Sequence, residues 1–140
     1  MPSELAAHAV QESGMCFTAT TGGHALTLDY PMNPGDAVAG PTPLQSLLAC
    51  LAVCGGSTLG LVLARMRQPV EGIEVDARGS RRDEHPTVIT EIALEFTVRG
   101  AGVEPEAVGR ALKAAEEQLC PVWAMLKPGT PITASFEVVG

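Results

Sequence analysis

The first 64 residues of this 140-residue chain contain no lysine and no arginine. All nine basic residues lie at or after Arg65, while sixteen acidic residues bring the formal net charge to -7. Proteins that bind nucleic acid concentrate positive charge where it meets the phosphates. The sequence therefore argues against nucleic acid as a partner.

The chain is also poor in aromatic residues and begins without a secretory signal. Aromatics make up 4% of the residues against 46% apolar residues, so we expect one aliphatic core. Residues 1–5 offer neither a basic segment nor the start of an apolar run, which a signal peptide requires. We therefore expect the four cysteines, at positions 16, 50, 54 and 120, to be reduced thiols in a cytoplasmic protein.

No charged residue lies between Asp36 and Arg65. A run of this length could cross a bilayer, but it includes polar side chains and glycines and lacks the density of large apolar residues of a span. A helix that is apolar on nearly every side is also typical of a protein core. We expect a buried helix from Pro43 to about Arg67 and no membrane association. A domain this small cannot cover such a helix completely, which predicts a homodimer.

The rest of the chain reads as alternating short strands and helices, so the predicted fold class is α+β with one domain over residues 1–140. Thr42 is placed to cap the long helix, with Gln45 completing a capping box. Gly22 and Gly23 predict a hairpin turn. The periodicity predicts strands over 14–21, 25–30, 73–78, 91–99 and 131–138, a loop over 31–42, a helix over 104–119 and a short helix from 121.

Two adjacent glycines, Gly55 and Gly56, interrupt the long helix directly after Cys54. Each costs about 1 kcal/mol relative to alanine in a helix. This cost indicates close backbone packing or a bend at this point. A tolerated flexible spot is the alternative, and the sequence leaves both open.

Two of the four cysteines are candidates for thiol chemistry. Cys120 directly precedes Pro121 at the start of a short helix, where the helix dipole lowers a thiol pKa, so the residues alone favour Cys120 as the reactive one. Cys16 and Cys50 are expected to be core residues. Cys50 and Cys54 are four residues apart, as metal ligands on a helix can be, but zinc needs further ligands and the three histidines are scattered. We expect no metal and no cofactor.

The segment from Gly40 to Cys54 opens a helix with a proline and reaches a cysteine eleven residues after Pro43. Residues 82–86 (RDEHP) precede a strand, and Cys120-Pro121-Val122 closes an amphipathic helix. This ordered set resembles the OsmC/Ohr family, named for osmotically inducible protein C and organic hydroperoxide resistance protein. The resemblance extends from about Gly40 to Val138.

The resemblance implies a fold, an assembly and a reaction. The implied fold is an intertwined homodimer with antiparallel strands wrapped around a long buried central helix. The implied reaction is reduction of organic hydroperoxides, in which Cys54 attacks the peroxide and Cys120 resolves the sulfenic acid as a disulfide. A dithiol reductant, lipoylated or thioredoxin-like, then restores the two thiols.

The sequence departs from the pattern of the active peroxidases at two points. The family's glutamate near the start of the central helix is Gln45 here, and the arginine that its N-terminal strands supply is absent. A cysteine in mid-helix gains little from the dipole, so Cys54 needs a cationic neighbour. Arg81 and Arg82 are the substitutes if their loop reaches across the dimer. The alternative function is a non-catalytic dimer that binds a small apolar molecule or senses oxidants.

Overall fold

The computed structural model describes residues 3–140, and its elements form two compact units. The boundary falls between Leu47 and Leu48, within helix α1 (Pro43–Arg65). Each unit has its own sheet. The prediction of a single domain stays a prediction.

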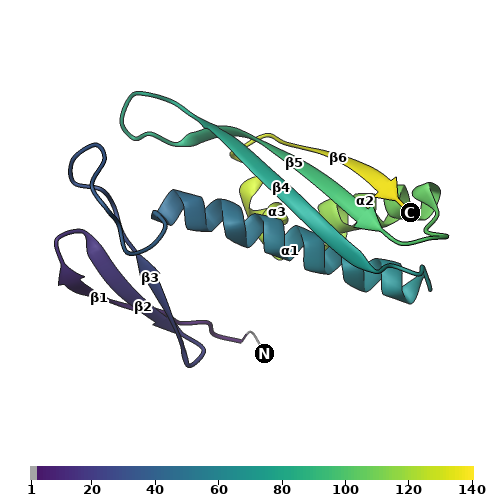
Figure 1. Ribbon diagram of the computed structural model, residues 1–140, viewed down its shortest axis with the longest axis horizontal. Coiled ribbons are helices and arrows are strands. Elements are labelled where there is room, and N and C mark those ends of the chain that lie inside the picture. The colour runs from purple at the N-terminus through teal and green to yellow at the C-terminus, as the bar shows by residue number, and fades with distance from the viewer. Residues whose placement is uncertain (1–2) are drawn as a thin grey trace. The chain divides into compact units, whose positions relative to one another are not determined.

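The first unit contains an antiparallel sheet in the order β1-β2-β3, formed by β1 (His8–Ser13), β2 (Cys16–Thr21) and β3 (His24–Leu28) (Figure 1). Gly22 and Gly23 both have positive φ angles, of 57° and 79°, and join β2 to β3. Two consecutive positive φ angles are the requirement of the tight hairpin turn that the sequence predicts. The predicted strand over 14–21 begins only at Cys16, because Gly14, with φ at 54°, turns the chain after β1.

Helix α1 begins with the predicted capping box. The Thr42 hydroxyl accepts a hydrogen bond of 3.2 Å from the Gln45 backbone N–H, and the Gln45 side-chain oxygen accepts one of 3.0 Å from the Thr42 N–H. The two side chains thereby satisfy backbone donors that the first helical turn leaves free. The predicted start of the long helix is confirmed, and Gln45 acts there through its neutral side chain.

The second unit contains a three-stranded sheet in the order β4-β5-β6. Strand β4 (Gly72–Arg81) pairs antiparallel with β5 (Ile89–Arg99), whereas β6 (Ile132–Val139) pairs parallel with β5. Antiparallel pairing, as expected, therefore holds for three of the four strand pairs. The parallel pair requires a crossover, which α2 (Pro105–Ala114), η1 (Ala115–Leu119) and α3 (Pro121–Leu126) provide. The predicted helix over 104–119 is thus α2 followed by a π-helical turn.

One narrow stripe of α1, spaced every four residues, is fully buried in the second unit and consists of Leu51, Gly55, Leu59 and Leu63. Gly55 lies against Phe96 of β5, and Gly109 of α2 lies against Phe136 of β6. Phe96 and Phe136 are directly paired in register, so α1 and α2 cover the same face of the sheet (Figure 1).

By length and composition, helix α1 could cross a membrane. Of its most apolar 18-residue stretch, 22% is buried within the chain. Core helices of soluble proteins have the same composition. The stripe that packs on the sheet fits the expected core helix. Full burial is not observed within one chain, because Val53 and Leu61 of α1 are 70% and 53% exposed.

Candidate functional site: the Cys54 and Cys120 thiols

Cys54 lies in the middle of α1, next to the buried Gly55, and is half-buried. A Cβ atom on Gly56 would lie only 2.9 Å from Val75 Cγ2, and one on Gly55 would lie 3.4 Å from Phe96 Cζ. The helix backbone therefore approaches the sheet closely just after Cys54. Close backbone packing is thus confirmed at Gly56, whereas a Cβ on Gly55 would make an ordinary contact.

Cys120 is positioned by the π-helical turn that precedes it. Its backbone N–H donates to the Ala115 carbonyl over 2.9 Å, which is a bond across five residues instead of the four of an α-helix. The additional residue rotates the end of the helix by about 100° relative to an uninterrupted α-helix. Cys120 is 1% exposed, and Pro121 starts α3 directly after it.

The structure brings the two thiols together, and both are free. Burial raises the pKa of the Cys120 thiol above its ordinary value, and a hydrogen bond and the charge of Cys54 raise it further. Both effects of Cys54 favour the protonated form of Cys120.

The prediction that the helix dipole gives Cys120 a lowered pKa is wrong. The Trp123 backbone N–H does lower the Cys120 pKa, as does the Thr58 hydroxyl, but the loss of solvation outweighs both. Helix α3 has only six residues, and the Cys120 side chain makes no capping hydrogen bond. Burial is a tertiary property, so the local sequence gave no sign of it.

Aromatic side chains close the site on the side of the sheet. The Phe96 and Trp123 rings stack with their centroids 6.3 Å apart and an interplanar angle of 11°. Phe96 in turn lies against Gly55. Because Trp123 belongs to α3, these contacts hold α3 beside the turn of α1 that contains Cys54. Trp123 is fully buried, and its indole N–H has no hydrogen-bond partner in the described part of the chain.

Thr58 is a site residue that the sequence analysis missed. It lies four residues after Cys54, so the two side chains share one face of α1. Its hydroxyl lowers the pKa of the Cys120 thiol. The four-residue spacing from Cys54 was the available signal.

Arg81 and Arg82 lie away from Cys54 within the chain. A Cβ on Gly79 would lie 3.4 Å from Leu48, whereas Gly56 faces Val75, so β4 and α1 run in opposite directions. Rises of about 1.5 Å per helical residue and 3.3 Å per strand residue place Arg81 roughly 15 Å from Cys54 along the sheet. That separation exceeds the reach of one arginine side chain.

Arg82 has a different set of partners. Its guanidinium donates to the backbone carbonyls of Glu84, His85 and Pro86 over 2.8–3.0 Å and organises the loop between β4 and β5. A contact between either arginine and Cys54 would have to come from a second copy of the chain.

The other two cysteines are not part of this pair. Cys50 is exposed, so its prediction as a core residue is wrong: it lies beside the buried stripe of α1 and not within it. Cys16 is half-buried in β2. Within residues 3–140, no group of three or more His, Cys, Asp or Glu side chains is arranged to hold a metal ion.

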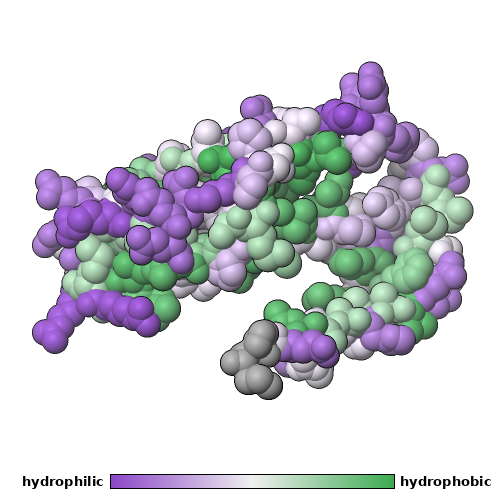
Figure 2. All heavy atoms as spheres, turned by 180° about the vertical axis from the view of Figure 1, so that it is seen from behind, coloured by the Kyte–Doolittle hydropathy of each residue, from purple (hydrophilic) through white to green (hydrophobic). Residues whose placement is uncertain are grey.

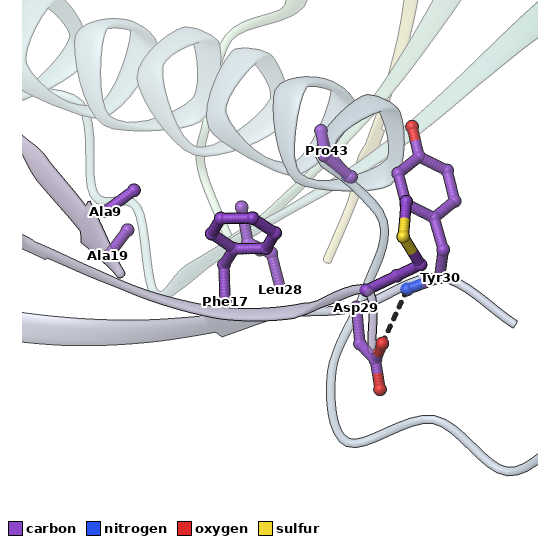
Figure 3. Close-up of a pocket in the computed structure, with 8 residues that line it drawn as sticks. Ala9, Phe17, Ala19, Leu28, Asp29, Tyr30 and Pro43 are labelled. Carbon is purple, nitrogen blue, oxygen red and sulfur yellow. Dashed lines mark hydrogen bonds between the residues drawn. The ribbon is translucent and has the colours of Figure 1, made fainter. Parts of the chain in front are cut away.

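The first unit contains an apolar cavity of about 270 Å³ (Figure 3). Its wall consists of side chains from the three-stranded sheet, the following loop and the start of α1, namely Ala9, Met15, Phe17, Ala19, Leu28, Asp29, Tyr30 and Pro43. The Asp29 carboxylate is turned to the backbone, where it accepts hydrogen bonds from the N–H groups of Tyr30 and Ala39. The cavity therefore presents almost no polar group to a ligand.

Comparisons with known proteins agree with the fold. The curated protein YhfA of Escherichia coli strain K12 is 35% identical over 117 residues, which is 84% of each chain. A hypothetical protein from Aquifex aeolicus has a solved structure that matches with a TM-score of 0.87 and 28% identity, over 98% of this chain and 97% of that one. An organic hydroperoxide resistance protein from Legionella pneumophila matches with a TM-score of 0.73 and 19% identity, over 97% and 98%. Residues 34–135 match the OsmC-like protein family, and the chain belongs to this family.

Proposed function

We propose that this protein is a thiol peroxidase that reduces organic hydroperoxides with Cys54 and Cys120, in defence against oxidative stress. The observation that carries the proposal is the pair of neighbouring free thiols, one half-buried on α1 and one fully buried after η1. The family includes proteins named for organic hydroperoxide resistance, which supports the same role. YhfA, the curated relative, has a name that states no activity.

In the proposed reaction, the Cys54 thiolate attacks one oxygen of the hydroperoxide. An S–O bond forms, the O–O bond breaks, and the alcohol leaves after taking up a proton. Cys120 then attacks the sulfur of the Cys54 sulfenic acid, forming the disulfide and releasing water. One hydroperoxide and two thiols thus become one alcohol, one water and one disulfide, which an external dithiol reduces.

The burial of the two thiols supports this order of events. Cys54 is the less buried of the two thiols, so it is the sulfur that a hydroperoxide meets first. Cys120 is protonated and shielded from solvent, which suits a thiol that must survive until the sulfenic acid forms. Gln45 serves the helix cap in this proposal, and Arg81 or Arg82 contributes to Cys54 only from a second copy.

The proposal is tested by mixing reduced protein with one equivalent of cumene hydroperoxide and following free thiols over seconds. We expect two thiols to be lost and a Cys54–Cys120 bridge to be found by mass spectrometry. Cys54→Ser should abolish both, and Cys120→Ser should lose one thiol and leave a sulfenic acid that dimedone traps. Cys50→Ser is the matched control on the same helix and should react as the unchanged protein does. Survival of all thiols for many minutes would refute the peroxidase.

We further propose that the active form is a cytoplasmic homodimer. Exposed apolar side chains support a second copy as the cover, since Val53 and Leu61 of α1 and Val10 and Leu26 of the first sheet are each about half exposed or more. Broad apolar areas are visible on the surface in Figure 2. Patches of this kind mark interaction surfaces. Light scattering at micromolar concentration should give twice the chain mass of 14.5 kDa, and a monomer would contradict this proposal.

The second candidate function, binding of a small apolar molecule, is favoured by the cavity of the first unit. Its volume of about 270 Å³ exceeds the roughly 150 Å³ of an apolar cavity that binds benzene. A fluorescent apolar probe such as N-phenyl-1-naphthylamine should bind, and Ala19→Phe, which fills the cavity, should abolish binding. Unchanged binding to this variant would exclude the cavity.

A further inference from the structure

The π-helical turn before Cys120 deprives one backbone carbonyl of its usual partner. In an α-helix the Cys120 N–H would donate to the carbonyl of Glu116, four residues earlier. Here it donates to the Ala115 carbonyl instead, over 2.9 Å. The next residue is Pro121, which has no N–H to donate. Residues 120 and 121 therefore supply no backbone donor to the Glu116 carbonyl.

A lysine side chain takes the place of that donor. The Lys127 ammonium donates a hydrogen bond of 3.1 Å to the Glu116 carbonyl. Lysine side chains satisfy the last carbonyls of helices in this way, and a charged donor makes a stronger hydrogen bond than a neutral one. Within residues 3–140 Lys127 makes no ion pair with a carboxylate, so its charge is directed at this carbonyl.

Lys127 is itself held in place by α3. It directly follows that helix, and its backbone N–H donates to the Trp123 carbonyl over 3.0 Å. Trp123 is fully buried and stacks on Phe96 of the sheet. At the other end of α3 the Cys120 carbonyl accepts a bond of 3.0 Å from the Ala124 N–H. The Lys127 side chain therefore ties the π-helical turn to a short helix anchored in the core, with Cys120 between the two.

We propose that Lys127 is a positioning residue for the resolving step: its bond to the π-helical turn keeps Cys120 directed at Cys54. This inference rests on the proposed peroxidase function and adds to it the group that holds the buried thiol in line. Without Lys127 the turn has an alternative, because an α-helical bond from the Cys120 N–H would satisfy the Glu116 carbonyl. That change would rotate the backbone at Cys120 by about 100° and turn its side chain away from Cys54.

The first test measures the disulfide without any hydroperoxide. In a protein with Cys16→Ser and Cys50→Ser, two thiols remain, and mixtures of oxidised and reduced dithiothreitol give the equilibrium constant of the Cys54–Cys120 bridge. In this exchange the cyclic disulfide and two protein thiols become the dithiol and the protein disulfide. Lys127→Met should lower the constant about two- to tenfold, as expected for one lost hydrogen bond. Lys127→Arg keeps a charged donor and should restore most of it.

Lys113→Met is the matched control, because Lys113 is an exposed lysine in the last turn of α2 and its loss removes the same charge. It should leave the constant unchanged. Urea unfolding of the reduced proteins shows that each variant is folded. An equal constant in Lys127→Met and the unchanged protein would overturn the inference, as would an equal loss in Lys113→Met.

The second test separates the two steps of the reaction in the same protein. After mixing with cumene hydroperoxide, Lys127→Met should leave the rate of Cys54 oxidation unchanged and prolong the life of the dimedone-reactive sulfenic acid about two- to tenfold. An equal slowing of both steps would indicate a merely structural effect and would overturn the positioning role. If no variant reacts with hydroperoxide, the peroxidase function fails, while the dithiothreitol equilibrium still decides whether Lys127 positions Cys120.

Discussion

Gly56 offers the sharpest test of how closely α1 packs beside the thiol pair. A Cβ atom at this position would lie 2.9 Å from Val75 Cγ2, whereas carbon atoms in contact prefer about 3.5–4.0 Å. Val75 is β-branched and lies on a strand, so it has few rotamers with which to give way. We expect Gly56→Ala to lower the free energy of unfolding by about 1–3 kcal/mol through overpacking and to raise it by about 1 kcal/mol through the higher helix propensity of alanine.

The net expectation is a loss of about 1 kcal/mol in the free energy of unfolding, or roughly 4 °C in Tm. Urea unfolding followed by circular dichroism, at one fixed protein concentration, measures it. Gly55→Ala is the matched control, because its Cβ would lie at an ordinary contact distance of 3.4 Å from Phe96. It should be neutral or stabilising by up to about 1 kcal/mol.

The double variant Gly56→Ala/Val75→Ala isolates the contact. Removing both γ-methyl groups of Val75, including the Cγ2 that faces position 56, should cost less in the presence of Ala at position 56 than in its absence, with a coupling of about 1 kcal/mol. If Gly56→Ala is as stable as the unchanged protein, or if Gly55→Ala loses as much, then the close approach of α1 to the sheet is not the reason for these glycines.

Three further predictions concern the helix cap, the loop and the buried thiol. Thr42→Ala should lower the free energy of unfolding by about 1 kcal/mol, while Gln45→Glu, which keeps the accepting oxygen, should change it little in urea unfolding. Arg82→Met should cost about 1 kcal/mol and increase hydrogen exchange in the loop over 82–88, and unchanged exchange would refute its organising role. The raised Cys120 pKa stabilises the fold below about pH 8.5, and this contribution is lost as the pH rises through the folded-state pKa. Cys120→Ala should therefore abolish part of the alkaline loss of stability, measured by urea unfolding in reductant at pH 7.5, 8.5 and 9.5.

The elements that the sequence predicted correctly are those with strong local signals. The capping box at Thr42 and Gln45 and the two-glycine hairpin turn depend on neighbouring residues only, and both are present. Strand β5 alternates clearly between apolar and polar residues because one of its faces packs against helices. Strand β1 was missed because all six of its residues are exposed, so burial imposed no alternation on its sequence.

The features that were missed or misjudged depend on contacts between distant residues. The parallel pairing of β5 with β6 depends on the crossover through α2, η1 and α3. The residues of β6 do not indicate whether the neighbouring strand runs parallel or antiparallel to it. The π-helical turn has no reliable local signature, although it determines which way Cys120 points. The sign of the Cys120 pKa shift was wrong for the same reason, since a local dipole argument contains no information about burial.

Under the proposed reaction, the contributions to the Cys120 pKa also explain how the first step prepares the second. Two of the three effects that raise this pKa, a hydrogen bond and a charge, come from Cys54 itself. A sulfenic acid on Cys54 carries no thiolate charge, so oxidation removes the charge effect while the Trp123 N–H and the Thr58 hydroxyl remain in place. Cys120 thus loses its proton more easily after Cys54 has been oxidised than before. The contact with Cys54, which adds to the effect of burial in keeping Cys120 protonated in the reduced protein, then brings together the two sulfurs that form the disulfide.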